Sequence, residues 1–545
     1  FGSIKTTDLF PAILTFCKRF RKKRQKKLDE IELLHDFKCN WKLNDEDFIE
    51  YNKLKNQFVQ IRTLYKTLKR QAKGKYKNPS LAPEVIEFHK KSQEFQRKID
   101  DELAKWKNEV NGKKALLIEG ARRIGKSTAA LKFAKEHYKS YILIDFGEAR
   151  ESVKQLFYNL LDNLDTFFMI LSAEYDVNLY ERNSLIIFDE VQLFPKAREA
   201  IKYLVKDGRY DYIETGSLIS IKENTQNILI PSEERSVCMY PMDFEEFAWA
   251  MGENKLIEYI RNCFEKQEPL YDSLHKKATL LFQEYILVGG MPKAVDSFLL
   301  EKKQFNKCDT EKRDILNTYR NDILKLNASY KNKVLSIFDQ IPGFLSAHEK
   351  RVKISSINPN DKAINYEETF FWLSDSMICN ECFLCNDPNV GLSLNENRSF
   401  IKCYMGDTGL LVSHTFDENV KKDIGIYASI LNDKLSINRG MFFENVVAQM
   451  LVANGNKLYF YTHYSEEKHR NDIEIDFILS SGNKINNRII PIEVKSSKKY
   501  KTESLDKFLE KYKSRIDKAY IIHPKNLTIK EDGIICIPAY MTFCL

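Results

Sequence analysis

Eight consecutive residues have the types and spacing needed to bind the phosphate groups of a nucleotide. They read Gly120-Ala121-Arg122-Arg123-Ile124-Gly125-Lys126-Ser127, and Thr128 follows them. In this G-x-x-x-x-G-K-S pattern the glycines let the backbone turn tightly and direct its N–H groups at phosphate oxygens. The lysine places a charge between the β and γ phosphates, and the serine hydroxyl is a ligand for Mg²⁺. The motif therefore predicts an ATP·Mg²⁺ site.

Two adjacent carboxylates form a second element of the same chemistry. Asp189 and Glu190 directly follow the apolar run Leu185-Ile186-Ile187-Phe188. A carboxylate at the end of such a strand can hold Mg²⁺ through water, which is the role we expect for Asp189. We expect Glu190 to polarise the attacking water. The pair therefore favours hydrolysis of ATP over binding alone.

Two further positions are candidates for contact with the nucleotide. Thr215-Gly216-Ser217 end the next apolar run, where Thr215 and Ser217 could sense the γ phosphate or form a plain turn. Arg235 could reach the phosphates as an arginine finger, in cis or from a neighbouring copy, or be an ordinary surface residue. The sequence leaves both alternatives open.

The elements around these motifs alternate between strands and helices. Residues 95–110 have the apolar spacing of an amphipathic helix, and a long helix is expected from about 152 to 173. Short apolar runs predict buried strands at 115–118, 141–145, 185–188 and 212–215. Alternation of this kind predicts an α/β fold, a parallel sheet with helices on both faces.

A second group of ionisable residues lies near the end of the chain. Glu444 stands in the first turns of an expected amphipathic helix, and Asp476 stands in an alternating strand over 474–479. Glu493 and Lys495 are two residues apart in a further strand, so they share a face. If the two strands are antiparallel neighbours, Glu444, Asp476 and Glu493 could hold Mg²⁺ while Lys495 activates water for phosphodiester cleavage. The alternative is a strand pair with salt-bridged edge residues.

The cysteines and the composition limit the class of protein. Cys379, Cys382 and Cys385 have metal-ligand spacing, with Cys403 as a possible fourth ligand, but the segment reads as a strand that turns Cys382 away from the other two. An odd total of 11 Cys and a mild net charge of +8 fit a reduced, cytoplasmic protein. No apolar run approaches the length of a membrane span.

Residues 1–92 differ from the remainder of the chain. The run from Lys18 to Lys27 carries eight cations in ten residues and is followed by Lys-rich stretches with helical spacing. Such a basic helical extension is either a solvated arm or a contact for nucleic acid. Its role stays open.

From about Phe95 to Leu545 the chain resembles the prokaryotic AAA-type ATP-binding proteins that have a C-terminal conserved domain of unknown function. The resemblance rests on an ordered series of motifs: GARRIGKS, LIIFDEVQ, ETGSLIS, MYPMDFEEFAWA, YILVGGMPKAV, YMGDTGLL, RGMFFENVVAQML, EIDFIL and PIEVKSS. It implies an ATPase domain, a winged-helix-like middle module and a terminal fold similar to PD-(D/E)XK nucleases. The nuclease motifs fall on Asp476, Glu493 and Lys495, although Ile475 replaces the usual proline before Asp476.

The expected organisation follows from the pattern and the resemblance together. After the extension over 1–92 we expect a P-loop ATPase domain over 93–247, a helical region over 248–345, a winged-helix-like module over 346–436 and a nuclease-like domain over 437–545. The expected function is an Mg²⁺-dependent ATPase coupled to a nuclease-like domain that acts on DNA. The alternatives are an ATP-dependent binding switch and a DNA-binding regulator whose nuclease fold is inactive. The oligomeric state stays open.

Overall fold

The computed structural model of the chain describes residues 95–216, 232–300, 303–347, 349–354, 366–389, 391–416, 439–467, 469–481 and 488–545. Contacts divide the chain into two units, Phe1–Lys91 and Ser92–Leu545. The basic extension expected over residues 1–92 therefore lies outside the described residues, as does Ser217.

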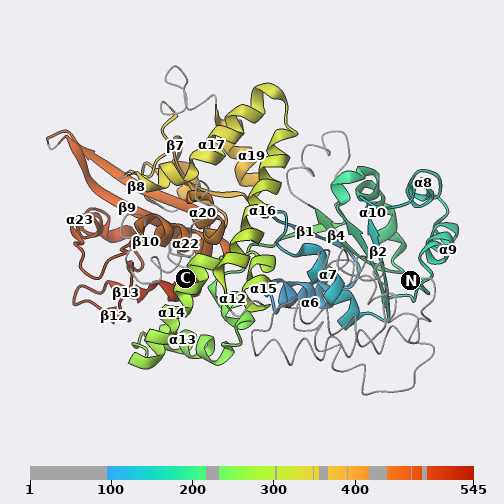
Figure 1. Cartoon of the computed structure of the whole chain (residues 1–545), viewed down its shortest axis with the longest axis horizontal. Helices are drawn as coiled ribbons and strands as arrows, with labels where there is room; N and C mark the ends of the chain where they lie inside the picture. Colours follow the sequence, from blue (N-terminus) through green and yellow to red (C-terminus); the bar gives the residue numbers. More distant parts are fainter. Residues whose placement is uncertain are drawn as a thin grey trace, which may run out of the picture. The chain divides into compact units, whose positions relative to one another are not determined.

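A five-stranded parallel sheet opens the described part of the chain (Figure 1). Its order is β2-β3-β4-β1-β5, and its strands are β1 (Ala115–Glu119), β2 (Ser140–Asp145), β3 (Ser184–Asp189), β4 (Asp211–Gly216) and β5 (Glu234–Cys238). Strands β3 and β4 are buried on both faces, as parallel strands between two layers of helices are. The prediction of a parallel α/β sheet is confirmed.

The helices that precede and connect these strands follow the sequence pattern with one exception. They are α6 (Lys98–Val110), α7 (Lys126–His137), α8 (Glu151–Asn159), α9 (Leu164–Tyr175) and α10 (Pro195–Asp207). The single helix expected from 152 to 173 is wrong, because the chain breaks it into α8 and α9. The Asn163 side chain accepts the N–H of Thr166 at 3.2 Å and so begins α9 as a separate helix.

A helical region follows the parallel sheet. Its helices are α12 (Phe244–Ala250), α13 (Asn254–Lys266), α14 (Asp272–Val288), α15 (Pro292–Leu300), α16 (Phe305–Leu324) and α17 (Ala328–Ser346). The turn between α14 and α15 requires glycine, because a Cβ on Gly290 would lie 2.0 Å from the carbonyl oxygen of Met242. Among the described helices, none combines the length and the apolar character that crossing a bilayer requires.

A mixed sheet forms the last part of the chain. Its order is β12-β13-β11-β10-β9-β8-β6-β7, and its strands are β6 (Cys379–Cys385), β7 (Glu396–Met405), β8 (Leu458–Ser465), β9 (Arg470–Ser480), β10 (Ile489–Val494), β11 (Tyr520–His523), β12 (Thr528–Ile529) and β13 (Ile535–Pro538). β6 pairs with β8, so one sheet crosses the boundary expected at residue 436.

Two helices cover opposite faces of this mixed sheet. Helix α22 (Arg439–Ala453) packs in one apolar cluster with Ile492 of β10, whereas α23 (Glu503–Lys511) packs in another with Ile521 of β11. The remaining elements of this part are α19 (Glu367–Asp375), α20 (Thr408–Thr415) and the 3-10 helices η3 (Leu392–Asn395), η5 (Lys513–Arg515) and η6 (Ala539–Cys544). Because α22 and α23 pack in different apolar clusters, side chains on the two faces of the mixed sheet lie in separate environments.

Candidate functional site: the nucleotide loop and the C-terminal carboxylates

The loop between β1 and α7 makes the tight turn that a phosphate-binding loop needs. Gly125 has a φ of +95°, in the left-handed region, directly before α7 begins at Lys126. A Cβ on Gly120 would lie 2.4 Å from the carbonyl oxygen of Met239, so glycine is required there as well. The other residues predicted for the loop lie around this turn: Ala121 and Ile124 are buried, Arg122 is half-buried, and Arg123 and Thr128 are exposed.

Lys126 lies inside the curve of the loop. Its Nζ donates hydrogen bonds to the carbonyl oxygens of Gly120 and Ala121, both at 2.9 Å. Burial lowers the pKa of Lys126 to about 8, and the carboxylates of Glu190 and Asp189 oppose that shift. The ammonium group therefore lies within electrostatic reach of Asp189, predicted to hold Mg²⁺, and of Glu190, predicted to act on water.

One carboxylate oxygen joins three elements at the carboxyl edge of the parallel sheet. Oδ1 of Asp189 accepts the Ser127 hydroxyl at 2.6 Å and also accepts the hydroxyl of Thr215. The sheet order explains this meeting, because β4 lies between β1, which leads into the loop, and β3, which ends at Asp189. Of the two alternatives for Thr215, this contact favours participation in the site.

Glu190 follows Asp189 at the point where β3 ends. Its φ is +54°, a left-handed conformation that non-glycine residues adopt rarely. Oε2 of Glu190 accepts a hydrogen bond from the amide of Gln192 in the 3-10 helix η1 (Val191–Leu193). The strained turn separates the two carboxylates, so that Asp189 bonds to Ser127 while Glu190 is held by its own segment.

The structure does not bring Arg235 to this loop. In the sheet register Arg235 lies opposite Leu116, near the start of β1, whereas the loop follows the end of that strand. Its guanidinium lies 3.7 Å from the carboxylate of Glu102 on α6. Within one copy, the arrangement fits the surface-residue alternative.

The C-terminal strands pair as the sequence predicts. β9 and β10 are antiparallel, with Phe477 opposite Ile492 and Ile478 opposite Pro491. β9 also has one residue more than β8 between the pairs Ile475–Tyr461 and Ile478–Tyr459, which is a β-bulge beside Asp476. Instead of continuing the ladder, Oδ2 of Asp476 accepts the backbone N–H of Val494 at 2.7 Å.

Glu493 and Lys495 share a face, as predicted, but it is not the face of Glu444. Nζ of Lys495 lies 2.5 Å from Oε1 of Glu493. In the parallel pairing of β10 with β11, Glu493 lies beside Ile521, which packs with α23. Glu444 lies on α22, which covers the other face. The sheet therefore separates the two carboxylates.

Lysines that the sequence motifs did not indicate neutralise Glu444 and Asp476. Lys350 and the hydroxyl of Tyr404 (2.5 Å) bond to Glu444, and Nζ of Lys402 lies 3.5 Å from Glu444 and 3.9 Å from Asp476. Burial alone would raise the pKa of Glu444, but Lys350 and Lys402 lower it to about 2. Burial raises the pKa of Asp476 to about 6, and the negative charge of Glu444 adds to that shift.

The expected metal cluster of Glu444, Asp476 and Glu493 is therefore not assembled. Within the described ranges, no three His, Cys, Asp or Glu side chains are grouped closely enough to hold a metal ion. The physical reason is twofold: alternation along β10 turns Glu493 to the α23 face, and two lysines take the place of a cation beside Glu444.

The raised pKa of Glu493 predicts how the free energy of unfolding depends on pH. Burial raises its pKa from 4.5 to about 7, with Lys495 opposing that shift. Because the folded-state pKa is raised, the folded protein binds the proton more tightly, and stability is lost as the pH rises from about 4.5 to 7. At 1.36 kcal/mol per pH unit, Glu493 contributes at most about 3 kcal/mol to this loss.

We expect Glu493→Gln to remove that contribution, so that the variant loses less stability than the wild type between pH 4.5 and 7. Urea unfolding at several pH values measures it. Glu503→Gln, an exposed carboxylate on α23, is the control. Parallel curves for Glu493→Gln and the wild type would contradict the assignment.

The cysteine segment is a strand, as its pattern indicates. β6 spans Cys379–Cys385. Cys382 lies within electrostatic reach of Lys402 and Glu444, while the Cys379 side chain forms a hydrogen bond with Cys403 of β7, and both of these cysteines are free thiols. These thiols are part of the buried core of the sheet. Burial raises the pKa of the Cys385 thiol to about 11.

Comparison with known proteins agrees with the nucleotide loop. Residues 112–248 match a family model described as an AAA domain. Residues 279–421 and 439–541 match two models described as domains of unknown function, DUF8612 and DUF4143. No curated protein matches the sequence.

One solved structure, a Walker-type ATPase of Pyrococcus abyssi, is similar over 59% of this chain and 96% of its own, at 14% identity and a TM-score of 0.35. A likeness that weak carries no conclusion about this chain. Residues 112–248, which include the phosphate-binding loop, Asp189 and Glu190, are therefore similar to an AAA domain.

Proposed function

We propose that this protein is an Mg²⁺-dependent ATPase whose C-terminal region binds DNA without cutting it. The observation that carries the first half is the single oxygen of Asp189 shared by Ser127 and Thr215. It joins the phosphate-binding loop, the acidic strand and the strand between them into one polar centre beside Lys126. The absence of cleavage rests on the lysines around Glu444, and the contact with DNA rests on exposed lysines near α23.

The loop supplies binding and orientation of the nucleotide. The backbone N–H groups before α7 and the positive end of that helix favour the phosphates. Lys126 exchanges its two carbonyl partners for phosphate oxygens and keeps its charge, because a phosphate dianion stabilises the protonated form. Ile124 and Ala121, both buried, anchor the loop to the core.

The residues around Asp189 fit a magnesium ion. A hydroxyl and a carboxylate oxygen 2.6 Å apart are the hard oxygen donors that Mg²⁺ prefers. Ser127 would hold the ion directly and Asp189 through water, and the bound ion neutralises charge that develops on the phosphates. Thr215 keeps the Asp189 carboxylate oriented by its hydrogen bond.

Glu190 is the residue proposed to act on water. Its carboxylate lies within electrostatic reach of Lys126 and is oriented by Gln192. A carboxylate in this position accepts the proton of the attacking water as its oxygen approaches the γ phosphate. Glu190 bonds to Gln192 whereas Asp189 bonds to Ser127, so we assign the two carboxylates separate tasks.

The C-terminal carboxylates favour the inactive-nuclease alternative. Metal-assisted cleavage needs carboxylates that share an ion, but Lys350 and Lys402 already compensate the charge of Glu444 and Asp476. A buried carboxylate with such partners is stabilised as an ion pair and gains little from a metal. The cluster then serves to hold α22, β7 and β9 together.

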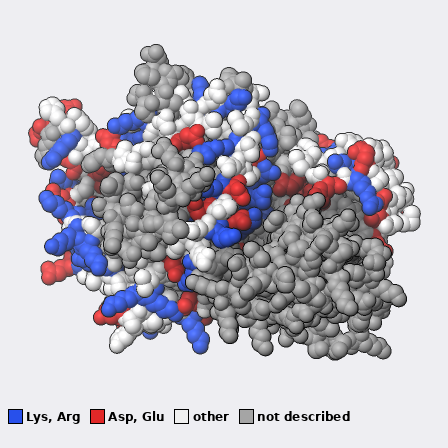
Figure 2. All heavy atoms as spheres, viewed as in Figure 1, with Lys and Arg blue, Asp and Glu red and all other residues white. Residues whose placement is uncertain are grey.

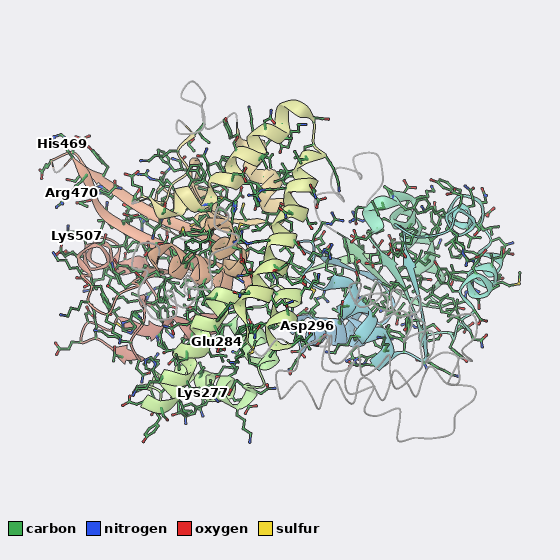
Figure 3. All side chains as sticks on the ribbon, viewed as in Figure 1. Lys277, Glu284, Asp296, His469, Arg470 and Lys507 are labelled. Atoms are coloured by element: carbon green, nitrogen blue, oxygen red, sulfur yellow. The ribbon has the colours of Figure 1, made fainter. Side chains whose placement is uncertain are left out.

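The surface near α23 supports a contact with DNA. Residues 498–525 contain seven exposed lysines, Lys498, Lys499, Lys501, Lys511, Lys513, Lys518 and Lys525, against four exposed acidic residues. Figure 2 shows Lys and Arg gathered at the left of the view, where Figure 1 places α23 and β12. Figure 3 labels Arg470 and Lys507 at this edge, and Nζ of Lys507 lies 3.5 Å from the carbonyl of Asp472. A basic surface of this kind attracts phosphate backbones.

The test combines DNA binding with plasmid cleavage in Mg²⁺, with and without ATP. We expect the wild type to bind DNA with steep salt dependence and to leave the plasmid intact. Charge reversal of Lys498, Lys499 and Lys525 together should weaken DNA binding roughly tenfold or more at low salt and flatten the salt dependence. ATP hydrolysis without DNA should not change.

The matched control reverses three exposed lysines on helices of the ATPase domain, Lys105, Lys135 and Lys202. Equal loss of DNA binding in both triple variants would show that net charge, not this surface, binds DNA. Plasmid cleavage by the wild type that Asp476→Ala or Lys495→Ala abolishes would restore the nuclease assignment.

A further inference from the structure

The C-terminal end of α16 contacts the nucleotide loop twice. Nη1 of Arg122, the third residue of the loop motif, lies 2.7 and 2.8 Å from the two carboxylate oxygens of Asp322. One helical turn earlier, the Tyr319 hydroxyl donates to the backbone carbonyl of Arg122 at 3.3 Å, and the Tyr319 side chain is buried. A helix from outside the AAA-domain match therefore bonds to both the backbone and the side chain of one loop residue.

Arg122 can pair either with Asp322 or with the phosphates of a bound nucleotide. Its guanidinium is bonded to Asp322 and is also within electrostatic reach of Glu190, which places it close to the catalytic side of the loop. A bound triphosphate would bring several negative charges to this loop. Those charges attract Arg122 and repel Asp322, so a bound nucleotide and the Arg122–Asp322 pair oppose each other.

The other end of α16 reaches the C-terminal part of the chain. Oδ1 of Asp309 accepts the hydroxyl of Ser413 on α20 at 2.6 Å, and Arg313 donates to the carbonyl of Phe416 at 3.2 Å. In Figure 1, α16 runs along the boundary between the parallel sheet and the elements of the mixed sheet. Loss of the Arg122–Asp322 contact therefore affects one end of α16, and the first turns of the same helix are hydrogen-bonded to α20 and to Phe416, which follows it.

We propose that Asp322 is a positioning residue that opposes ATP binding, because it holds Arg122 against α16. A bound nucleotide attracts Arg122 away from Asp322 and so releases the end of that helix. The proposal uses the ATP-binding domain but does not depend on the DNA contact or on Glu190. In this proposal, α16 transmits the conformational effect of nucleotide binding to the C-terminal region. The proposal also predicts the sign of the effect, since Asp322 should oppose ATP binding.

Asp322→Asn is the direct test, because asparagine keeps the shape of the side chain without its charge. We expect ATP to bind about 3- to 10-fold more tightly, while kcat stays within about twofold, since Asp322 does not touch the reacting atoms. In an Arg122→Ala background the same substitution should change ATP affinity much less. A double-mutant cycle by fluorescence or calorimetric titration measures this coupling.

Asp339→Asn is the matched control. It breaks another ion pair of α16, in which Arg320 lies 3.1 Å from Asp339 of α17. ATP affinity should be unchanged in this variant. Unchanged or weaker ATP binding in Asp322→Asn, or an equal gain with and without Arg122, would overturn the proposal.

Hydrogen exchange of the wild type gives a measurement that needs no variant. ATP should speed exchange of the amides in the last turn of α16, around Asp322, and slow exchange in the loop at 120–127. Asp322→Asn should show the faster exchange at α16 without ATP. Failure of ATP to bind at all would instead contradict the ATP-binding assignment, and exchange at α16 that ignores bound ATP would contradict the role of Asp322.

Discussion

Replacing Lys126 with alanine should weaken the binding of ATP·Mg²⁺ roughly 100- to 10,000-fold. Two or more charge-assisted hydrogen bonds to phosphate oxygens disappear together, each contributing about 1.5–3 kcal/mol. The remaining loop still offers backbone N–H groups and the N-terminus of α7, so residual weak binding is expected. Calorimetric titration with ATP in Mg²⁺ measures the affinity.

Two controls separate loss of binding from loss of structure. Lys126 is buried and donates to the Gly120 and Ala121 carbonyls, so its removal takes one hydrogen-bond donor from each carbonyl. Thermal unfolding of Lys126→Ala without nucleotide shows whether this costs stability. Lys135→Ala removes an exposed lysine of the same helix and should bind ATP normally. Wild-type affinity in a folded Lys126→Ala protein would remove the phosphate-loop assignment.

The nucleotide site could be predicted because its determinants are local in the sequence. The loop from Gly120 to Ser127 lies between one strand and one helix, and Asp189 ends a strand of the same sheet. In a parallel sheet the carboxyl ends of all strands meet at one edge, so strand alternation alone brings Asp189 toward Ser127. The shared hydrogen bond of Thr215 needed the strand order, which the sequence does not state.

The C-terminal cluster could be predicted only in part, since its geometry depends on long-range contacts. The pairing of β9 with β10 followed from the short turn between them. The β-bulge beside Asp476 and the face of Glu493 depend on β8 and β11, which flank that pair. Lys350 and Lys402 come from segments far from every acidic motif, so no spacing rule indicated them.

Several motifs that carry the family resemblance have a structural task. The Asp407 carboxylate in YMGDTGLL accepts the N–H of Gly290 in YILVGGMPKAV at 2.5 Å. Gln449 in RGMFFENVVAQML donates to Asp407 at 3.3 Å and to the hydroxyl of Tyr285 at 3.0 Å. All of these groups are buried, so each unmade bond would carry a desolvation cost. This network joins α14, α20 and α22 and gives a reason for the motifs that does not require catalysis.

Glu190→Gln should slow ATP turnover roughly 100- to 10,000-fold while leaving ATP·Mg²⁺ bound nearly as tightly as in the wild type. Glutamine keeps the size of the side chain but cannot accept the proton of the attacking water. The ground-state phosphates are held by Lys126 and Ser127, so affinity should not fall. Loss of one negative charge near Lys126 should even favour the bound state slightly, because Glu190 attracts that ammonium group.

A comparison with Glu199→Gln keeps this test specific. Glu199 pairs with Lys196 at 2.7 Å on α10, away from the loop, and its substitution should leave turnover unchanged. Gln192→Ala adds a graded result: it removes the hydrogen bond that orients Glu190, so kcat should fall less than in Glu190→Gln, with ATP affinity preserved. If Glu190→Gln hydrolyses ATP at the wild-type rate, another group activates the water. If it loses ATP binding in proportion to turnover, Glu190 contributes to the ground state, and the separate tasks inferred for the two carboxylates would be wrong.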